Sequence, residues 1–366
     1  MRIAQLAPLA ESVPPKLYGG TERVIAWLVD ELVEIGHDVT LFASGDSKTK
    51  GKLHPVWPRA LRLGRRGTDP NAACALLIEA IAERAGSFDV IHSHVDWLPL
   101  PVLSRTGVPF LTTMHGRLDL PGLSDVVGAF PKAAFVSISD NQRRPLPDAN
   151  WIATIQHGLP NDLFKPSYER GPYLAFLGRL TAEKGPEDAI RIARAARMPL
   201  RIAAKIPRAE TAYFEKKLVP SIDGGQIQVV GEVDEIGKQP FLAGAAALLF
   251  PIKWPEPFGL VMIEAMACGT PVIAYRAGSV PEVVEDGVTG FIVDNEEQAI
   301  RAVNELGRLD RRVIRARFEE RFAASRMANE YERRYRELLA HGGHEGFKKE
   351  PARSRLAVET ASKSLR

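Results

Sequence analysis

Cysteine is scarce in this sequence. Cys74 and Cys268 are the two cysteines among 366 residues, and neither belongs to a Cys-x-x-Cys pair or to a stretch rich in histidine. A disulfide framework and a structural zinc site are therefore not expected, and a reducing compartment fits this cysteine usage.

Long apolar runs are also missing. A spanning helix needs roughly 18 or more consecutive apolar residues, and no such stretch occurs. The opening MRIAQLAPLA lacks the charged segment and apolar run of a signal peptide. We therefore expect a cytoplasmic protein with at most peripheral membrane contact. The arginines of RALRLGRRG (59–67) are expected to form an exposed basic loop, with such a membrane contact as the alternative.

A strong excess of charge is absent as well. Lys and Arg number 48 against 45 Asp and Glu, which gives a formal net charge of +3. This balance does not indicate a nucleic-acid partner, yet it leaves cations that can face a phosphate-bearing ligand. The length predicts two domains, because single cores stop growing at about 250–300 residues.

Short apolar runs alternate with amphipathic segments, a pattern typical of parallel sheets covered by helices on both faces. A helix is predicted from Thr21 to Ile35, and the pattern is helical again from Glu296 to about Ala340. The prolines, glycine and charges of FKPSYERGP (164–172) indicate a linker. The expected strands are 2–7, 39–44, 89–94, 109–115 and 134–139 before it, and 173–178, 199–205, 227–232, 246–251 and 271–275 after it.

The predicted fold is therefore α/β, with two Rossmann-like domains and C-terminal helices. We place the N-terminal domain at 1–165 and the C-terminal domain at 166–325. A helix over 326–341 is a candidate to cross back to the N-terminal domain. The tail 342–366 is polar and basic without an apolar period, so we expect it to be disordered and solvated, with contact to an anionic surface as the alternative.

Two loops at predicted strand ends have the composition of phosphate sites, because ligands of open parallel sheets bind beyond the carboxyl ends of the strands. Gly19 and Gly20 precede the first long helix, where bare backbone and free amides favour an anion; a flexible turn is the alternative. Arg179 and Lys184 follow strand 173–178 and could hold a diphosphate. The alternative is a solvated loop in which Glu183 pairs with a neighbour.

The segment EPFGLVMIEAMACGTP (256–271) gives a stronger signal. Flanking prolines keep Glu256 in a loop, and a helix is predicted from about residue 258 until Gly269 stops it. Glu264 lies about two turns into that helix among apolar residues, where a carboxylate needs hydrogen-bond donors such as sugar hydroxyls. An ordinary surface glutamate is the alternative. Free amides at the helix start are those of Phe258, Gly259 and Leu260.

The whole pattern resembles the family 4 retaining glycosyltransferases of the two-domain GT-B fold, whose domains face a central cleft. The Glu-x(7)-Glu arrangement, with EPFG at its start and AxxxGTPVIA following, resembles the family's donor motif. Both domains take part in the match, through YGGTERV, TTMHG (112–116), HGLPNDLF (157–164), GRLTAEKG (178–185) and AGSVPEVVEDGVTGFIV (277–293).

The resemblance implies roles for these residues. Glu264 would hold the nucleotide ribose, and Glu256 would contact the donor sugar, with the backbone from Phe258 to Leu260 binding sugar and phosphate. Arg179 and Lys184 match the pair that grips the diphosphate.

Further matches extend the implied donor site. Gly19 and Gly20 match the loop that closes over the donor, and His115 matches a histidine that reaches the transferred sugar. Where the family often has glycines, this chain has Lys205, which either meets the nucleotide or pairs with an acid. The base would be read by backbone near Gly231, Glu232 and Val233.

The implied reaction is transfer of a hexose from a nucleotide diphosphate sugar, with a UDP-sugar favoured, to an acceptor hydroxyl. It is expected to retain the anomeric configuration and to need no metal or other cofactor, and the sequence has no Asp-x-Asp to hold a metal. Glu256 acting as a covalent nucleophile is a less favoured route. The rival functions are a related GT-B epimerase or phosphorylase, and a nucleotide-sugar binding protein without turnover.

The acceptor is expected on the N-terminal domain. Loops at strand ends there supply Trp97, Arg117 and Asp119 as candidate contacts. The opening APLAESVPPKLYGGTERV and the segment LFASGDS resemble a subgroup that contains proposed pterin glucosyltransferases. A small aromatic acceptor therefore stands beside saccharide and lipid-linked acceptors.

Overall fold

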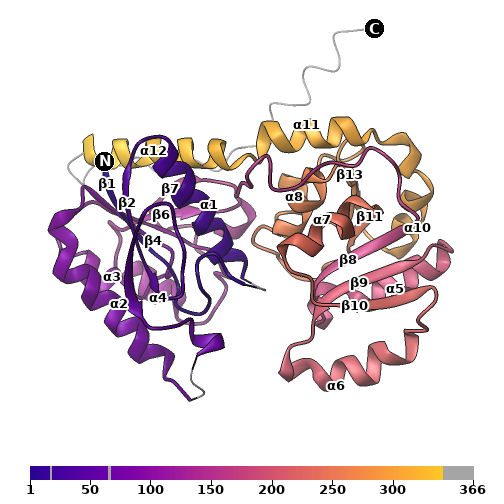
Figure 1. Ribbon diagram of the computed structural model, residues 1–366, viewed down its shortest axis with the longest axis horizontal. Helices are drawn as coiled ribbons and strands as arrows, with labels where there is room; N and C mark the ends of the chain where they lie inside the picture. The colour runs from indigo at the N-terminus through magenta and orange to yellow at the C-terminus, as the bar shows by residue number, and fades with distance from the viewer. Residues whose placement is uncertain (17–18, 65–66, 341–366) are drawn as a thin grey trace, which may run out of the picture.

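Two parallel sheets, each covered by helices, form the molecule (Figure 1). The computed structural model describes residues 1–16, 19–64 and 67–340. The expected disordered tail, Tyr18 of the glycine-rich turn and part of the arginine-rich loop lie outside these described residues. Within them, no helix is both long and apolar enough to cross a membrane.

The N-terminal domain is built on a seven-stranded sheet in the order β3-β2-β1-β4-β5-β6-β7. Every neighbouring pair in it is parallel. Its strands are β1 Arg2–Leu6, β2 Asp38–Ser44, β3 Lys52–Trp57, β4 Val90–Ser93, β5 Phe110–Thr113, β6 Ala134–Ser137 and β7 Trp151–Thr154. Its α-helices are α1 Gly20–Glu34, α2 Pro70–Arg84, α3 Leu100–Leu103 and α4 Leu123–Gly128.

The C-terminal domain has a six-stranded parallel sheet in the order β10-β9-β8-β11-β12-β13. The strands are β8 Tyr173–Arg179, β9 Leu200–Lys205, β10 Ile227–Gly231, β11 Ala245–Phe250, β12 Val272–Tyr275 and β13 Gly290–Val293. The helices are α5 Pro186–Ala195, α6 Thr211–Tyr213, α7 Glu235–Ala243, α8 Leu260–Ala267, α9 Val280–Val283, α10 Glu296–Asn304 and α11 Arg311–Arg321, and α12 Ala324–Ala340 follows this domain in sequence.

The strands β3, β7 and β13 were not among the predicted ones, and all three lie at sheet edges. In β7 three of the four residues are buried, so weak coverage does not explain why that strand was missed. In β3 no residue is fully buried, and Pro55 interrupts the run, as proline does in edge strands.

The region predicted as helical from Glu296 to about Ala340 contains the three α-helices α10, α11 and α12. Asp310 caps the start of α11 by accepting from the amide of Arg312, and the chain breaks again at Phe322 and Ala323. Leu159 pairs with Ala323 there, so two crossings between the domains lie side by side.

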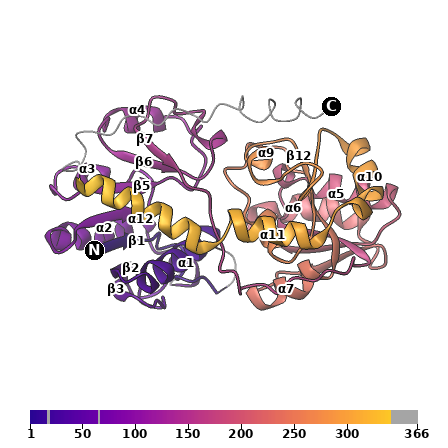
Figure 2. The same ribbon diagram turned by 90° about the horizontal axis from the view of Figure 1, so that it is seen from above.

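Helix α12 packs against the N-terminal domain although it follows the C-terminal one. Seen from above, α11 runs over the C-terminal domain and α12 over the N-terminal domain (Figure 2). Helix α12 contacts α1, and it buries Tyr331 and Tyr335, which are 1% and 0% exposed. Helix α12 is thereby fixed to the N-terminal domain.

Two arginines of α11 hold the linker. Arg311 donates to the carbonyl of Ser167, and Arg315 donates to the carbonyl of Phe164. Both guanidinium groups are nearly buried and are satisfied largely by carbonyl oxygens. The segment 164–172 contains no helix or strand. The bonds from Arg311 and Arg315 anchor it to the C-terminal domain.

Candidate active site

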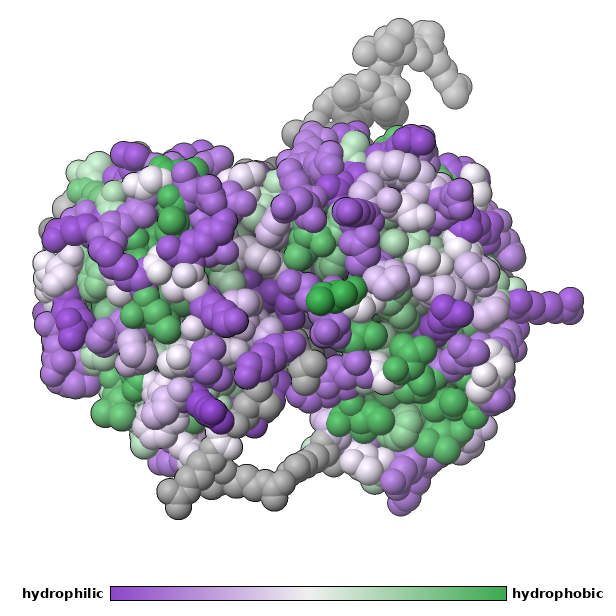
Figure 3. All heavy atoms as spheres, in the orientation of Figure 1, coloured by the Kyte–Doolittle hydropathy of each residue, from purple (hydrophilic) through white to green (hydrophobic). Residues whose placement is uncertain are grey.

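A cavity of about 360 Å³ lies between the two domains, at the carboxyl ends of β8, β9 and β11. In the space-filling view, hydrophilic side chains gather along the boundary between the domains (Figure 3). Both domains line the cavity, as expected for a site formed where parallel strands end and helices begin.

Helix α8 begins at this cavity, two residues later than predicted. Gly259 has φ +80, a left-handed conformation that cannot continue a helix, so α8 starts at Leu260. A Cβ on Gly259 would come within 2.8 Å of Cε of Met262. The residues that line the cavity at this end are Phe258, Gly259, Leu260 and Val261.

The late helix start changes the position of Glu264, which lies about one turn into α8 instead of two. Its side chain is 4% exposed, and its Oε1 lies 2.5 Å from Nζ of Lys238 on α7. A partly buried carboxylate with hydrogen-bond donors was predicted from the sequence, but Lys238 was not among the predicted site residues. The available signal was a lone cation shortly after a strand end, in GEVDEIGK (231–238).

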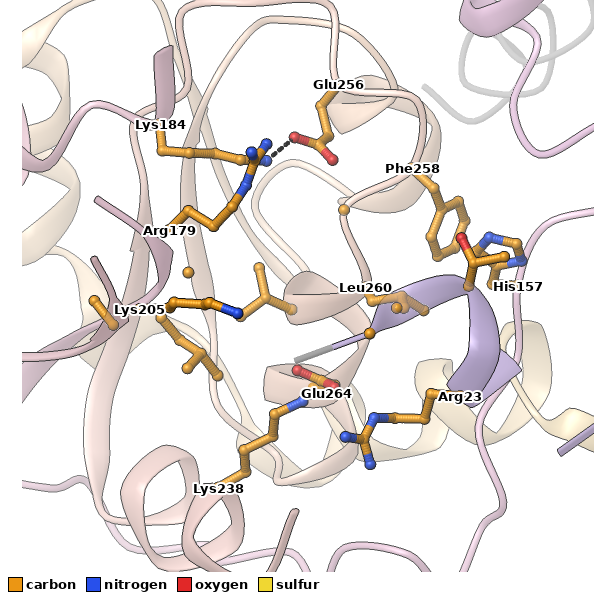
Figure 4. Close-up of a pocket in the computed structure, with 18 of the residues that line it drawn as sticks. Arg23, His157, Arg179, Lys184, Lys205, Lys238, Glu256, Phe258, Leu260 and Glu264 are labelled. Carbon is orange, nitrogen blue, oxygen red and sulfur yellow. Dashed lines mark hydrogen bonds and ion pairs between the residues drawn. The ribbon is translucent and has the colours of Figure 1, made fainter. Parts of the chain in front are cut away.

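Lys184 and Glu256 form an ion pair at the opposite end of the cavity (Figure 4). Their side chains are 15% and 13% exposed. The Nζ of Lys184 also lies 5.0 Å from the ring of Trp254, a cation–π distance. Lys184 and Glu256 were expected to contact different parts of the donor. They are 72 positions apart in the sequence, and the fold places them in direct contact.

Arg179 ends β8 and lines the same cavity. One of its terminal nitrogens lies 3.3 Å from Oε1 of Glu183, so the acid does pair with a neighbour as the alternative reading supposed. Nε of Arg179 is buried and has no hydrogen-bond partner among the described residues. The pairing with Glu183 is therefore compatible with a further bond to a ligand.

The N-terminal wall is the start of α1. Gly19 and Gly20 line the cavity there, and a Cβ on Gly20 would come within 3.2 Å of Cδ1 of Leu260. The first turns of α1 and α8 therefore meet across the cleft. Helix starts carry unpaired amides and partial positive charge, so this meeting point suits an anion.

His115 lines the cavity and is half-buried, with its Nδ1 atom buried. Desolvation lowers its pKa to about 3, so the imidazole is neutral. It stacks on His157 at 5.3 Å, and its Nε2 lies 2.9 Å from Nδ1 of His94. Burial lowers the pKa of His94 and of His157 as well.

Of the remaining donor-site candidates, three line the cavity and one does not. Lys205, Glu232 and Val233 line the cavity. Gly231 is not among the lining residues, but it ends β10 immediately before them with φ +87.

The acceptor candidates Trp97, Arg117 and Asp119 are not among the residues that line the cavity. Arg117 forms an ion pair with Asp119 at 2.8 Å, and its guanidinium lies 5.8 Å from the ring of Trp254, the ring that Lys184 also contacts. Trp97 is 38% exposed. The structure thus brings Arg117 near the cavity's edge but does not bring these three residues into the cavity.

Several residues that line the cavity were not predicted from the sequence. Besides Lys238, they include Glu22, Arg23 and His157. Burial raises the pKa of Glu22, and Arg23 forms an ion pair with Glu235 that spans the two domains. The signal for Glu22 and Arg23 was their place directly after the glycine pair, in GGTERV (19–24).

Comparison with known proteins gives matches to both domains. The family described as Glycosyltransferase Family 4 matches residues 18–154, and the family described as Glycosyl transferases group 1 matches residues 163–321. A similar curated protein is the D-inositol 3-phosphate glycosyltransferase of Thermobispora bispora, 26% identical over 76% of this chain and 79% of that protein. The Mycobacterium leprae protein of the same name is 29% identical over 61% of this chain and 60% of its own length.

Solved structures share the fold. The glycosyltransferase AviGT4 of avilamycin A biosynthesis has a TM-score of 0.69 at 24% identity and covers 93% of this chain and 98% of its own. HepE of Anabaena, in complex with UDP and glucose, has a TM-score of 0.73 at 20% identity, over 92% of this chain and 100% of its own. These neighbours have the same two-domain arrangement.

Proposed function

This chain is a glycosyltransferase of family 4 with the GT-B fold, and from that premise we propose that it moves a hexose from a nucleoside diphosphate sugar to an acceptor hydroxyl with retention and without a metal ion. The observation that carries the proposal is the pairing of charges in one cavity. Lys184 forms an ion pair with Glu256, and Lys238 forms one with Glu264. The starts of helices α1 and α8 line the same cavity.

The positive groups fit a departing diphosphate. Arg179 and Lys184 stand at the end of β8, and the starts of α1 and α8 add amide donors. Together they would stabilise the charge that grows on the diphosphate as its bond to the anomeric carbon breaks. Because the protein supplies this positive charge, the proposed route does not call on a metal.

Retention follows if the acceptor attacks from the face that the diphosphate leaves. Its hydroxyl proton would pass to a phosphate oxygen, which is the nearest base in this arrangement. Glu256 is tied to Lys184, which favours a binding role toward the donor sugar over covalent attack. Neutral His115 would add a contact to the same sugar.

A UDP-sugar is the donor we favour. The fold neighbour HepE binds UDP and glucose, and the cavity here offers a buried carboxylate, Glu264, to hold a ribose hydroxyl pair. For the acceptor, the names of the curated relatives suggest a phosphorylated cyclitol as the first compound to try. Small aromatic hydroxyl compounds form the second set.

Thermal unfolding with UDP, GDP and ADP at about 1 mM, with and without magnesium, tests the donor site. A ligand at ~100 times its dissociation constant adds ~2.7 kcal/mol, which raises the midpoint by several degrees. The expected result is a shift with UDP that magnesium does not change. No shift with any nucleotide would overturn the proposed donor, and a shift that appears only with magnesium would overturn metal independence.

A transfer assay completes the test. UDP-glucose and the acceptor panel are incubated with the protein, and the anomeric configuration of the product is read by NMR. An α-linked product from the α-linked donor supports retention, whereas a β-linked product contradicts it.

A further inference from the structure

A chain of buried hydrogen bonds runs from α12 to the cavity. The amide Nε2 of Gln5 donates to the hydroxyl of Tyr335 at 3.1 Å, and Oε1 of Gln5 lies 2.8 Å from Nε2 of His94. Nδ1 of His94 then lies 2.9 Å from Nε2 of His115. Gln5 and Tyr335 are 0% exposed and His94 is 2% exposed, so water does not compete for these bonds.

The chain has a direction that can be derived bond by bond. The amide oxygen of Gln5 is only an acceptor, so Nε2 of His94 must carry a hydrogen. Neutral His94 then has a bare Nδ1, and that nitrogen can only accept, so Nε2 of His115 must carry the hydrogen between them. Neutral His115 is left with a bare Nδ1.

We propose that Tyr335 and Gln5, acting through His94, are positioning residues that hold His115 in its Nε2–H tautomer, so that Nδ1 accepts a hydrogen bond from a hydroxyl of the transferred sugar. Nε2 is taken by His94, and Nδ1 of His115 is a buried atom with no partner among the described residues, so Nδ1 is the polar atom of this ring whose hydrogen bond a ligand would have to supply. The identity of the ligand rests on the proposed function; the tautomer does not.

Tyr335 is the residue that orients the amide. Its oxygen accepts from Gln5 and also lies 2.7 Å from Nδ1 of His92, a bond in which either group can be the donor. Without this hydroxyl, the amide nitrogen of Gln5 would be a buried donor with no partner. An unpaired N–H is less tolerated than an unpaired carbonyl oxygen, so the amide should turn over.

That rotation reverses the chain. The amide nitrogen of Gln5 would donate to Nε2 of His94, whose hydrogen would move to Nδ1 and be donated to His115. His115 would then carry its hydrogen on Nδ1 and present a donor to the cavity. The hydroxyl of Tyr335 on α12 thus decides whether His115 offers the sugar a hydrogen-bond acceptor or a donor.

Tyr331 provides a matched control. It lies one turn before Tyr335 on α12 and is equally buried. Its hydroxyl bonds to Oγ1 of Thr113 at 2.9 Å, and it reaches Tyr335 only through Thr113 and His92, not through Gln5. Tyr331→Phe therefore removes the same buried hydroxyl from the same helix while the Gln5–Tyr335 bond remains.

The test uses the full chain labelled with ¹⁵N-histidine. Long-range ¹H–¹⁵N correlation spectra at pH 7.5 separate protonated from bare ring nitrogens, and His115→Gln assigns the His115 signals. We expect the Nε2–H tautomer in the wild type and in Tyr331→Phe, and conversion of about half or more of His115 to Nδ1–H in Tyr335→Phe. An Nδ1–H tautomer in the wild type overturns the proposal, and so does an unchanged tautomer in Tyr335→Phe.

Binding of UDP and of UDP-glucose adds a functional readout. Tyr335→Phe should weaken UDP-glucose by about fivefold relative to UDP, whereas Tyr331→Phe should leave the ratio unchanged, because one net hydrogen bond to the sugar is lost. An equal ratio in both variants contradicts the sugar contact. Failure of the wild type to bind either ligand would instead refute the proposed donor, and the tautomer spectra would still decide the positioning role.

Discussion

Lys238 and Glu264 form an ion pair of 2.5 Å in the wall of the cavity, with side chains 15% and 4% exposed. Removing one partner of such a pair leaves a buried charge without compensation. We expect Lys238→Ala to lower the free energy of unfolding by about 3 kcal/mol, measured by urea denaturation.

The control for this pair is exposed Lys217 of the same domain, whose change to alanine should cost about 0.5 kcal/mol or less. The double variant Lys238→Ala with Glu264→Gln should recover most of the loss, since no charge is then left alone. A double variant as unstable as Lys238→Ala would show that the pair does not explain the stability.

Arg179 should matter for turnover and not for folding. Its side chain is 36% exposed and its visible partner is a surface acid, so Arg179→Ala should change stability little. If it stabilises the departing diphosphate by ~3 kcal/mol, turnover of UDP-glucose falls by roughly 10²-fold. Exposed Arg301 is the control; turnover of Arg179→Ala close to that of Arg301→Ala would exclude the role.

Gly185 and Gly287 separate backbone strain from crowding. Both have left-handed φ, +72 and +74, but a Cβ on Gly185 would lie 2.0 Å from the carbonyl oxygen of Pro251, whereas nothing lies within 4 Å of one on Gly287. Gly287→Ala should cost about 1–2 kcal/mol from φ alone. Gly185→Ala should cost distinctly more, about 4 kcal/mol or loss of folding. Equal midpoints in thermal unfolding for the two variants would contradict the close approach of the Lys184 loop to β11.

Much of this site could be predicted from local sequence, because its residues stand in the loops after strands. Arg179, Lys184 and Glu256 each lie where a predicted strand gives way to a helix, and the cavity contains all three. What could not be predicted are partners distant in the chain. Lys238 meets Glu264 only after two helices pack together, and no spacing encodes that contact.

The predicted start of α8 was wrong because one backbone angle sets where that helix begins. The apolar run around α8 extends to Phe258, but the conformation of Gly259 delays the helix to Leu260. Helix α12 shows the opposite case: its amphipathic pattern was recognisable, whereas the buried bonds of Tyr335 to His92 and Gln5 depend on tertiary packing.

The buried histidines should make stability fall as the pH drops below about 6.5. His92, His94, His115 and His157 are all neutral in the folded protein because burial lowers each pKa, to about 3 for His115. In the unfolded chain a histidine has a pKa of about 6.5, so below that pH the unfolded state binds more protons and is favoured. Stability is therefore full above pH 6.5 and declines toward the folded pKa values, by about 1.4 kcal/mol per pH unit for each histidine.

Urea denaturation at pH 7.5, 6.5 and 5.5 measures this loss, and His115→Gln isolates one contribution. Burial raises the pKa of Glu22, so that carboxyl offsets part of the total slope at the acid end, and the difference between wild type and variant is the cleaner quantity. The variant should lose about 1 kcal/mol less than the wild type between pH 6.5 and 5.5. Parallel profiles for the two proteins would mean that His115 takes up its proton in the folded state, and a neutral acceptor at Nδ1 would no longer be tenable at that pH.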